Sequence, residues 1–154
     1  MSPTPALDGQ VLGQAHHATR AVLERELARL GISFTQSVVL SVVARQGGEV
    51  ERATLTDRIT GALKVDEPAA RATIAELAEA GLLRQDDARV ALTAAGRDVR
   101  GRVDDAVAGI TARLYAGIPA RLYAGIPAEE MAVAGRVLSL VKRRADEDLA
   151  ASGG

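Results

Sequence analysis

Residues 65–93, VDEPAARATIAELAEAGLLRQDDARVALT, decide how this chain folds. Asp66 is a favourable helix N-cap, and Pro68 fits the first helical turn, where its missing N–H costs nothing. The apolar residues that follow recur at helical spacing and form one stripe: Ala70, Ile74, Leu77 and Ala78. Gly81 is predicted to stop this helix.

A short hairpin is predicted directly after the helix. Leu82–Leu83 starts a strand, residues 85–88 (QDDA) are rich in turn formers, and residues 89–92 (RVAL) return with Val90 and Leu92 alternating inward. A helix with one apolar face followed by a small hairpin is the layout of a winged helix-turn-helix. In that layout the outer helix face can lie in a DNA major groove, while the hairpin reaches the flanking backbone or minor groove.

The composition limits the fold class. At 154 residues the chain is one domain by size, and only 2% of its residues are aromatic. Its core must therefore be built from Ala, Val and Leu, which suits packed helices. We expect a mainly α fold with a small β-hairpin wing, flanked by N- and C-terminal helices. The chain contains no Cys, which excludes disulfides and Cys-ligated metals.

The expected location is the cytoplasm. No apolar run approaches the ~20 residues of a membrane span, and the first residues, MSPTPALDGQ, lack the pattern of a signal peptide. The net charge of −1 argues against a protein that coats nucleic acid indiscriminately, but it leaves room for a local basic surface.

Two helices are predicted near the start of the chain, well before residues 65–93. Residues 10–30 carry an apolar side made of Val11, Ala15, Ala18, Val22 and Leu27. Ser33 and Gln36 have the spacing of a capping box for the next helix, which is predicted to bury Val39, Leu40 and Val43.

Two more helices complete the predicted elements around the hairpin. Residues 53–66 should form the helix that supports the one beginning at Asp66, with these residues inward: Leu55, Ile59, Ala62 and Leu63. Thr93 can cap a long helix whose apolar face is Val99, Val103, Ala106, Ile110 and Leu114.

Three motifs, in order and with sensible spacing, resemble those of the MarR-type transcriptional regulators. They are residues 32–48 (ISFTQSVVLSVVARQGG), 77–84 (LAEAGLLR) and 90–96 (VALTAAG). The resemblance covers roughly residues 10–150. It implies double-stranded DNA with a palindromic operator as a partner, a homodimer joined through the terminal helices, and a small-molecule effector bound between those helices and the winged domain.

The residues expected to contact DNA lie on or next to the helix predicted to begin after Asp66, and around the hairpin: Lys64, Glu67, Arg71, Thr73, Arg84 and Arg89. Arg71 and Thr73 are the best base-reading residues, with a solvated helix charge as the alternative for Arg71. The resembling family carries an Asp-x-Arg signature in its wing, which Asp87-Ala88-Arg89 preserves. This hairpin is several residues shorter, so we expect Arg89 to meet phosphate instead of a groove floor.

The charge of the predicted DNA-binding region is balanced. Between Arg45 and Arg102 there are ten basic and ten acidic residues. Because the salt dependence of DNA binding scales with the number of phosphates neutralised, we predict modest non-specific binding with a shallow salt dependence.

The terminal helices carry apolar stripes that a small winged domain cannot all cover. Their simplest cover is a partner helix, and only the resemblance identifies that partner as a second copy. We predict a flexible tail at residues 1–9, dimerisation helices at 10–30 and 97–150, and a winged helix-turn-helix DNA-binding domain at 31–96. The expected dimerisation residues are Val11, Ala15, Val22, Ile110, Leu114, Leu138 and Val141.

An eight-residue duplication interrupts the last part of the chain. RLYAGIPA occurs at residues 113–120 and again at 121–128. One repeat of so short a period does not make a solenoid. We expect a break or kink between about Gly117 and Pro127, because Pro119 removes a helical hydrogen bond and crowds the preceding turn.

The predicted function is that of a dimeric, sequence-specific DNA-binding regulator, a repressor released by a small-molecule effector. The alternative is a winged-helix module for protein contacts that has lost or weakened DNA binding. We do not expect an enzyme, a cofactor or a metal site, since the sequence has no phosphate loop, catalytic triad spacing or metal-ligand cluster. His16 and His17 are interpreted as surface or interface residues, with metal binding or pH sensing as the alternative.

Overall fold

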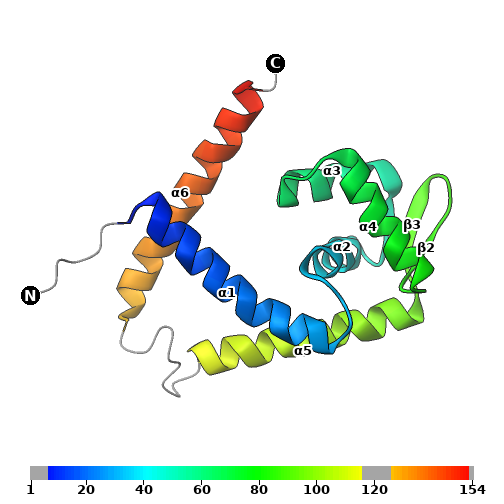
Figure 1. Cartoon of the computed structure of the whole chain (residues 1–154), viewed down its shortest axis with the longest axis horizontal. Helices are drawn as coiled ribbons and strands as arrows, with labels where there is room; N and C mark the ends of the chain where they lie inside the picture. Colours follow the sequence, from blue (N-terminus) through cyan, green and yellow to red (C-terminus); the bar gives the residue numbers. More distant parts are fainter. Residues whose placement is uncertain (1–6, 116–125, 153–154) are drawn as a thin grey trace, which may run out of the picture. The chain divides into compact units, whose positions relative to one another are not determined.

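The computed structural model describes residues 7–115 and 126–152 (Figure 1). Its helices are α1 (Gly9–Arg29), α2 (Phe34–Arg45), α3 (Arg52–Leu63), α4 (Glu67–Glu79), α5 (Ala94–Tyr115) and α6 (Ala128–Ser152). Its strands are β1 (Glu49–Glu51), β2 (Leu83–Gln85) and β3 (Arg89–Leu92). The chain divides into two units, residues 1–110 and 111–154. The fold is mainly helical with a small antiparallel sheet, as the sequence predicts.

The sheet has three strands in the order β1-β3-β2, one more than predicted. β1 pairs antiparallel with β3, with Val50 opposite Val90, and β2 pairs antiparallel with the other edge of β3. Sequence patterning missed β1 because the strand is only three residues long, with one buried residue between two exposed glutamates. The preceding Gly47 and Gly48 both have positive φ, which lets the chain turn from α2 into this strand.

The predicted helix caps are confirmed. The Ser33 hydroxyl accepts a hydrogen bond from the backbone of Gln36 while the Gln36 side chain accepts one from the backbone of Ser33, which is the predicted capping box. The Asp66 carboxylate accepts from Ala69 N at 2.9 Å and thereby begins α4. Gly81 ends the turn after α4 at φ +73°, a conformation that strongly favours glycine.

The core lies among α2, α3, α4 and the sheet. Its largest fully buried side chains are Leu27, Leu40, Leu55, Ile59, Ile74, Leu77, Val39, Val43 and Val90. The predicted stripes of α2, α3, α4 and β3 are therefore largely confirmed, whereas Val11, Ala15 and Ala18 of the predicted α1 stripe are exposed. Ala62, which was predicted to point inward, is exposed near the end of α3. Ala91 is buried although strict alternation predicts otherwise, because β3 is the central strand and has a neighbour on both sides.

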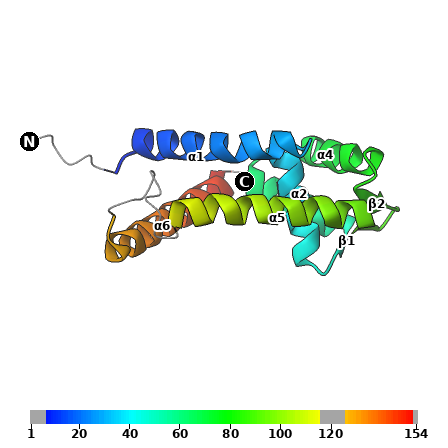
Figure 2. The ribbon, with the colours of Figure 1, turned by 90° about the horizontal axis from the view of Figure 1, so that it is seen from below.

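The start of α5 is fastened to the base of the hairpin. The Thr93 hydroxyl donates to the Gly81 carbonyl at 2.6 Å and accepts from Gly96 N at 3.0 Å, so it caps α5 as predicted. A Cβ on Gly96 would collide with the Leu82 carbonyl, so the helix and hairpin approach each other too closely for any residue but glycine. Figures 1 and 2 show the strands at this N-terminal end of α5.

The two ends of the predicted duplication are described, but its middle is not. α5 ends at Tyr115 and α6 begins at Ala128. The expected break between about Gly117 and Pro127 lies mainly outside the described residues, as do the first six residues of the predicted tail. Among the helices of residues 7–115 and 126–152, none is by itself long and apolar enough to cross a membrane. Only α1 and α2 taken together, across an 82° bend, pass that test.

Candidate nucleic-acid interface

α3 and α4 form the predicted helix-turn-helix. α3 ends at Leu63, and the left-handed conformation of its C-cap Lys64, at φ 55°, turns the chain within two residues into Asp66, the N-cap of α4. α4 then buries one side against α2 and α3 and leaves the other exposed. The exposed side begins with Glu67 and, one turn later, Arg71. The motif therefore presents the first two turns of α4 to solvent.

Arg71 is exposed but ion-paired. Its guanidinium contacts the Glu67 carboxylate one turn earlier, and the two side chains are 66% and 57% exposed. Farther along α4, the Glu76 carboxylate accepts a hydrogen bond from Gln36 Nε2 at 3.2 Å, which turns it toward the start of α2. The exposed charges of α4 are therefore the Glu67–Arg71 pair at its start and Glu76 and Glu79 farther along.

Thr73 does not belong to the exposed face, which corrects its assignment as a base-reading residue. Only 9% of it is exposed, and its hydroxyl donates to the Ala69 carbonyl at 3.1 Å. It lies next to the buried Ile74, so both residues point into the core side of α4. A threonine within an apolar helical stripe can satisfy its hydroxyl on its own backbone, and the sequence alone does not distinguish that arrangement from exposure.

The tip of the hairpin is a tight turn organised by Asp86. One oxygen of its carboxylate accepts from Ala88 N at 2.9 Å and from Arg89 N at 2.7 Å. These two backbone hydrogen bonds, that from Arg89 first, stabilise the charged carboxylate and lower the pKa of Asp86 below 3.8, helped by the nearby guanidinium of Arg52. The turn therefore holds a carboxylate in its charged form.

Arg52, at the start of α3, ties the helix-turn-helix to the hairpin. Its backbone N donates to the Ala88 carbonyl at 2.8 Å, and its guanidinium donates to the Asp86 carbonyl. Arg52 is not among the predicted contact residues, because the sequence pattern predicts a helix from Ala53 and no strand before it. The alternation in residues 49–52 (EVER), with one valine among charged residues, is the signal that could have found it.

Arg89 and Arg84 lie on the two hairpin strands. Arg89 Nε contacts Glu49 Oε1 on β1 at 3.1 Å, and both side chains are about half exposed. Arg84 is exposed on β2 opposite Ala91, and no hydrogen bond or ion pair is seen for it within the described part of the chain. Two of the predicted contact arginines, Arg71 and Arg89, are thus already paired with carboxylates of the same chain.

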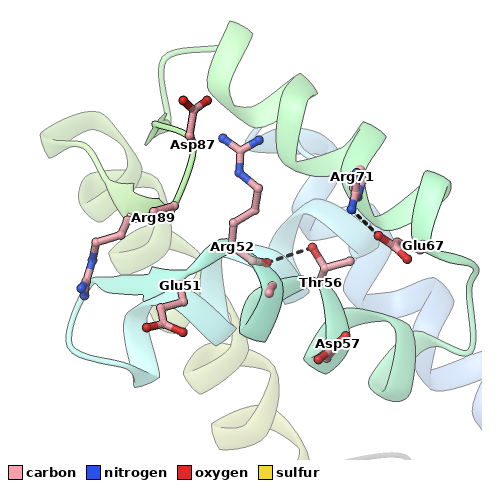
Figure 3. Close-up of a pocket in the computed structure, with 10 residues that line it drawn as sticks. Glu51, Arg52, Thr56, Asp57, Glu67, Arg71, Asp87 and Arg89 are labelled. Atoms are coloured by element: carbon pink, nitrogen blue, oxygen red, sulfur yellow. Dashed lines mark hydrogen bonds and ion pairs between the residues drawn. The ribbon is translucent and has the colours of Figure 1, made fainter.

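A cleft of about 510 Å³ lies between the hairpin tip, the start of α3 and the start of α4 (Figure 3). Its lining residues are Glu51, Arg52, Ala53, Thr56, Asp57, Glu67, Arg71, Asp87, Ala88 and Arg89. Figure 3 shows Arg52 projecting between the hairpin and α4, and the Glu67–Arg71 pair on α4. Of the predicted contact residues the cleft brings together Glu67, Arg71 and Arg89, while Lys64 and Arg84 lie outside its lining.

The predicted dimerisation residues differ in exposure. Val11, Leu138 and Val141 are 36%, 39% and 41% exposed. Ala15 is also exposed, Val22 and Ile110 are partly buried, and the side chain of Leu114 lies outside the described residues. α6 exposes two further valines that were not predicted, Val133 and Val137.

The two histidines lie on the exposed surface of α1. The rings of His16 and His17 are exposed and meet edge to face, with centroids 5.6 Å apart. Within residues 7–115 and 126–152 no group of three potential metal-binding side chains gathers at these or any other positions.

The sequence matches no protein-family model and no curated protein. The structure, in contrast, resembles several solved regulators over nearly its whole length. The reduced form of MarR from E. coli superposes with a TM-score of 0.64 at 20% identity, covering 90% of this chain and 95% of that one. A MarR family protein of Mycobacterium tuberculosis in complex with DNA gives 0.65 at 20% identity, covering 89% and 98%.

A third solved structure adds a bound small molecule. The organohalide-sensing transcriptional regulator RdhR, in its 2,4-dichlorophenol-bound form, superposes with a TM-score of 0.71 at 18% identity, covering 95% of this chain and 89% of that one. Identities this low establish the fold alone. The chain has the winged helix-turn-helix fold of MarR-type regulators.

Proposed function

We propose that this chain is a cytoplasmic, dimeric regulator of transcription that binds a palindromic operator in double-stranded DNA. The observation that carries the proposal is the joint exposure of Arg71 on α4 and Arg89 on the hairpin beside one cleft. It is supported by the fold, which is shared with a Mycobacterium tuberculosis protein solved in complex with DNA.

The dimensions of α4 suit a major groove. The helix has 13 residues and is therefore about 20 Å long, and the major groove of B-DNA, about 12 Å wide, admits an α-helix. In this orientation Arg71 contacts a base edge or a phosphate near the start of α4, with Glu67 beside it. Lys64, Arg84 and Arg89 contact phosphates on either side.

The proposed dimer rests on the apolar surface of the terminal helices. Val133, Val137 and Val141 recur every four residues on α6, so they lie along one side of the helix, and all three are exposed. A second copy of the same helix would cover them. A two-fold dimer presents two copies of α4 to two half-sites, which is why we propose a palindromic operator.

We propose repression relieved by a small-molecule effector as the mode of regulation. The support is the fold shared with RdhR, which was solved with bound 2,4-dichlorophenol. An effector that prefers a dimer with a different spacing of the two α4 helices would shift the population away from the form that fits the operator.

A second candidate function is a winged-helix module for protein contacts with lost or weakened DNA binding. It is favoured by one observation, the acidic character of α4, which carries Glu67, Glu76 and Glu79 against a single Arg71. Such a surface would suit a basic protein partner better than a phosphate backbone.

The experiment that separates the two functions measures binding to the gene's own upstream region. A fluorescent fragment of that region and a shuffled duplex of equal length and composition are titrated with the protein, with light scattering on the same samples. The regulator predicts preferential binding of the upstream fragment and a dimeric mass. A dimer that binds neither duplex, nor genomic fragments in general, would instead favour the protein-contact module.

A further inference from the structure

The two arginines that the proposed function assigns to DNA share an unusual feature: each is already held by a carboxylate of its own chain. Arg71 is paired with Glu67, and Arg89 is paired with Glu49. A phosphate must compete with these carboxylates for the N–H donors and the charge of each guanidinium. Glu67, Arg71 and Arg89 line the cleft between the hairpin and α4, whereas Glu49 lies outside that lining, so the competition takes place at the cleft for the first pair and at its edge for the second.

We propose that Glu67 and Glu49 are specificity-determining residues that act by withholding Arg71 and Arg89 from non-specific phosphates. This inference rests on the proposed DNA-binding function. On an arbitrary sequence, each displaced carboxylate would be left facing the phosphate backbone, with no compensating contact. At the operator, base contacts along α4 offset that repulsion.

The ion pairs are weak enough for phosphate and carboxylate to exchange reversibly on each arginine. All four side chains are about half exposed or more, and exposed ion pairs shift an equilibrium constant by roughly fivefold or less. An interaction of that size does not prevent operator binding, but it lowers the affinity for every competing site. Because specificity is a difference of affinities, a penalty on the wrong partners sharpens it without any new attractive contact.

The chain contains a matched control pair. Arg102 on α5 contacts Asp98 at 3.0 Å, also four residues apart with the carboxylate first, and these side chains are 64% and 62% exposed. Neither residue lines the cleft. Asp98→Asn therefore removes the same charge and frees an equally exposed arginine, but away from the proposed DNA-binding face.

The test compares Glu67→Gln, Glu49→Gln and Asp98→Asn on the operator fragment and on a random duplex, by fluorescence anisotropy between about 50 and 200 mM salt. We expect Glu67→Gln and Glu49→Gln each to tighten binding of the random duplex roughly two- to fivefold at low salt and operator binding less. The salt slope for random DNA should steepen by about 0.9 for each arginine freed. Asp98→Asn should change neither quantity by as much.

A double-mutant cycle separates the ion pair from the bulk charge. In an Arg71→Ala background, Glu67→Gln should tighten random-duplex binding no more than Asp98→Asn does, because no guanidinium is left to release. Glu67→Asp, which keeps the charge, should behave like wild type, since Asp98 shows that aspartate can pair across the same spacing. Thermal melts monitored by circular dichroism check that each variant is folded.

Two results would overturn the inference while leaving the proposed function intact. In the first, Glu67→Gln and Asp98→Asn tighten random-duplex binding equally, so that only net charge matters. In the second, Glu67→Gln weakens operator binding and leaves random-duplex binding unchanged, which would make Glu67 a direct base contact. If neither wild type nor any variant binds any duplex, the proposed function fails and the inference fails with it.

Discussion

On the surface formed by α4 and the hairpin, the exposed residues include two ion pairs, Arg71–Glu67 and Arg89–Glu49. On α6 the exposed residues include a stripe of valine and leucine, and none of the described residues of this helix is buried. The first surface is stable in water as it stands and can exchange its ion pairs for those of a partner. The second exposes apolar side chains to water, which is unfavourable until a partner surface buries them.

This difference means that salt should weaken contacts at the charged surface more than contacts at the apolar one. Ion pairs and phosphate contacts weaken as salt screens them, whereas apolar association does not. The DNA binding and dimer formation proposed above should therefore be separable in one salt titration, and the substitutions below test each region by itself.

The largest effect is expected in the core beneath the charged surface. Leu40→Ala removes a fully buried side chain from α2 and should lower the free energy of unfolding by about 2–5 kcal/mol. The control is Leu149→Ala on α6, where the side chain is 56% exposed and the change should be about 0.5 kcal/mol or less. Urea unfolding measures both. Equal losses would show that α6 is as well packed as the core.

The apolar surface is tested by Leu138→Glu. Burying a leucine contributes about 1.5–3 kcal/mol, so a charge there should raise the dimer Kd at least about tenfold. Ser139→Glu adds the same charge to the neighbouring exposed position, about 100° around the helix, and should leave the mass unchanged. Light scattering over a dilution series reads the mass. A dimer that survives Leu138→Glu would move the interface away from this stripe.

The joint between α5 and the hairpin is tested by Gly96→Ala. The added Cβ collides with the Leu82 carbonyl, so we expect a loss of about 1–3 kcal/mol in stability. Gly101→Ala in the same helix meets nothing within 4 Å and should be neutral or stabilising by about 0.5–1 kcal/mol. Thermal unfolding of the two variants gives the comparison. A stable Gly96→Ala variant would contradict the close approach of helix and hairpin.

The charged surface is tested by Arg71→Ala. If Arg71 contacts a base, the variant should lose about 1–3 kcal/mol of operator binding and relax the preference at one position. Arg102→Ala, which breaks the matched pair on α5, should change operator affinity much less. Fluorescence anisotropy with single-base operator variants measures both the affinity and the base preference. Unchanged affinity in Arg71→Ala would return this residue to the role of a solvated helix charge.

The smallest expected effect is a pH dependence confined to the hairpin turn. The lowered pKa of Asp86 means that the folded turn favours the carboxylate. Its contribution to stability is therefore present above pH 3.8 and is lost as the pH falls through the lower pKa of the folded state. The amide resonances of Ala88 and Arg89 report this transition by NMR, and Asp86→Asn should abolish their acid shift. An unaltered shift in the variant would assign the transition to another group.

Much of the fold was predictable because it depends on local patterns. The capping box at Ser33, the cap at Asp66 and the apolar stripe of α4 each depend on residues within one or two turns, and all are confirmed. β1 was missed because three residues provide too short a pattern. The boundaries of the proposed domains and the break within the duplication stay predictions.

The candidate site was predictable only as a set of residue types. The sequence places Arg71 near a predicted helix start and Arg89 next to a predicted turn, because both elements follow from local residue patterns. It does not indicate that Thr73 is buried, that Arg52 joins α3 to the hairpin, or that Glu49 lies beside Arg89.

Local structure follows from neighbours in the chain, so the sequence by itself determined the helices, their caps, the glycine stop and the hairpin. Which charges meet depends on contacts between residues far apart in sequence, such as the 40 positions that separate Glu49 from Arg89. Only the tertiary structure decided those pairings, because packing of the core brings α3, α4 and the sheet together and sets the register of β1 on β3.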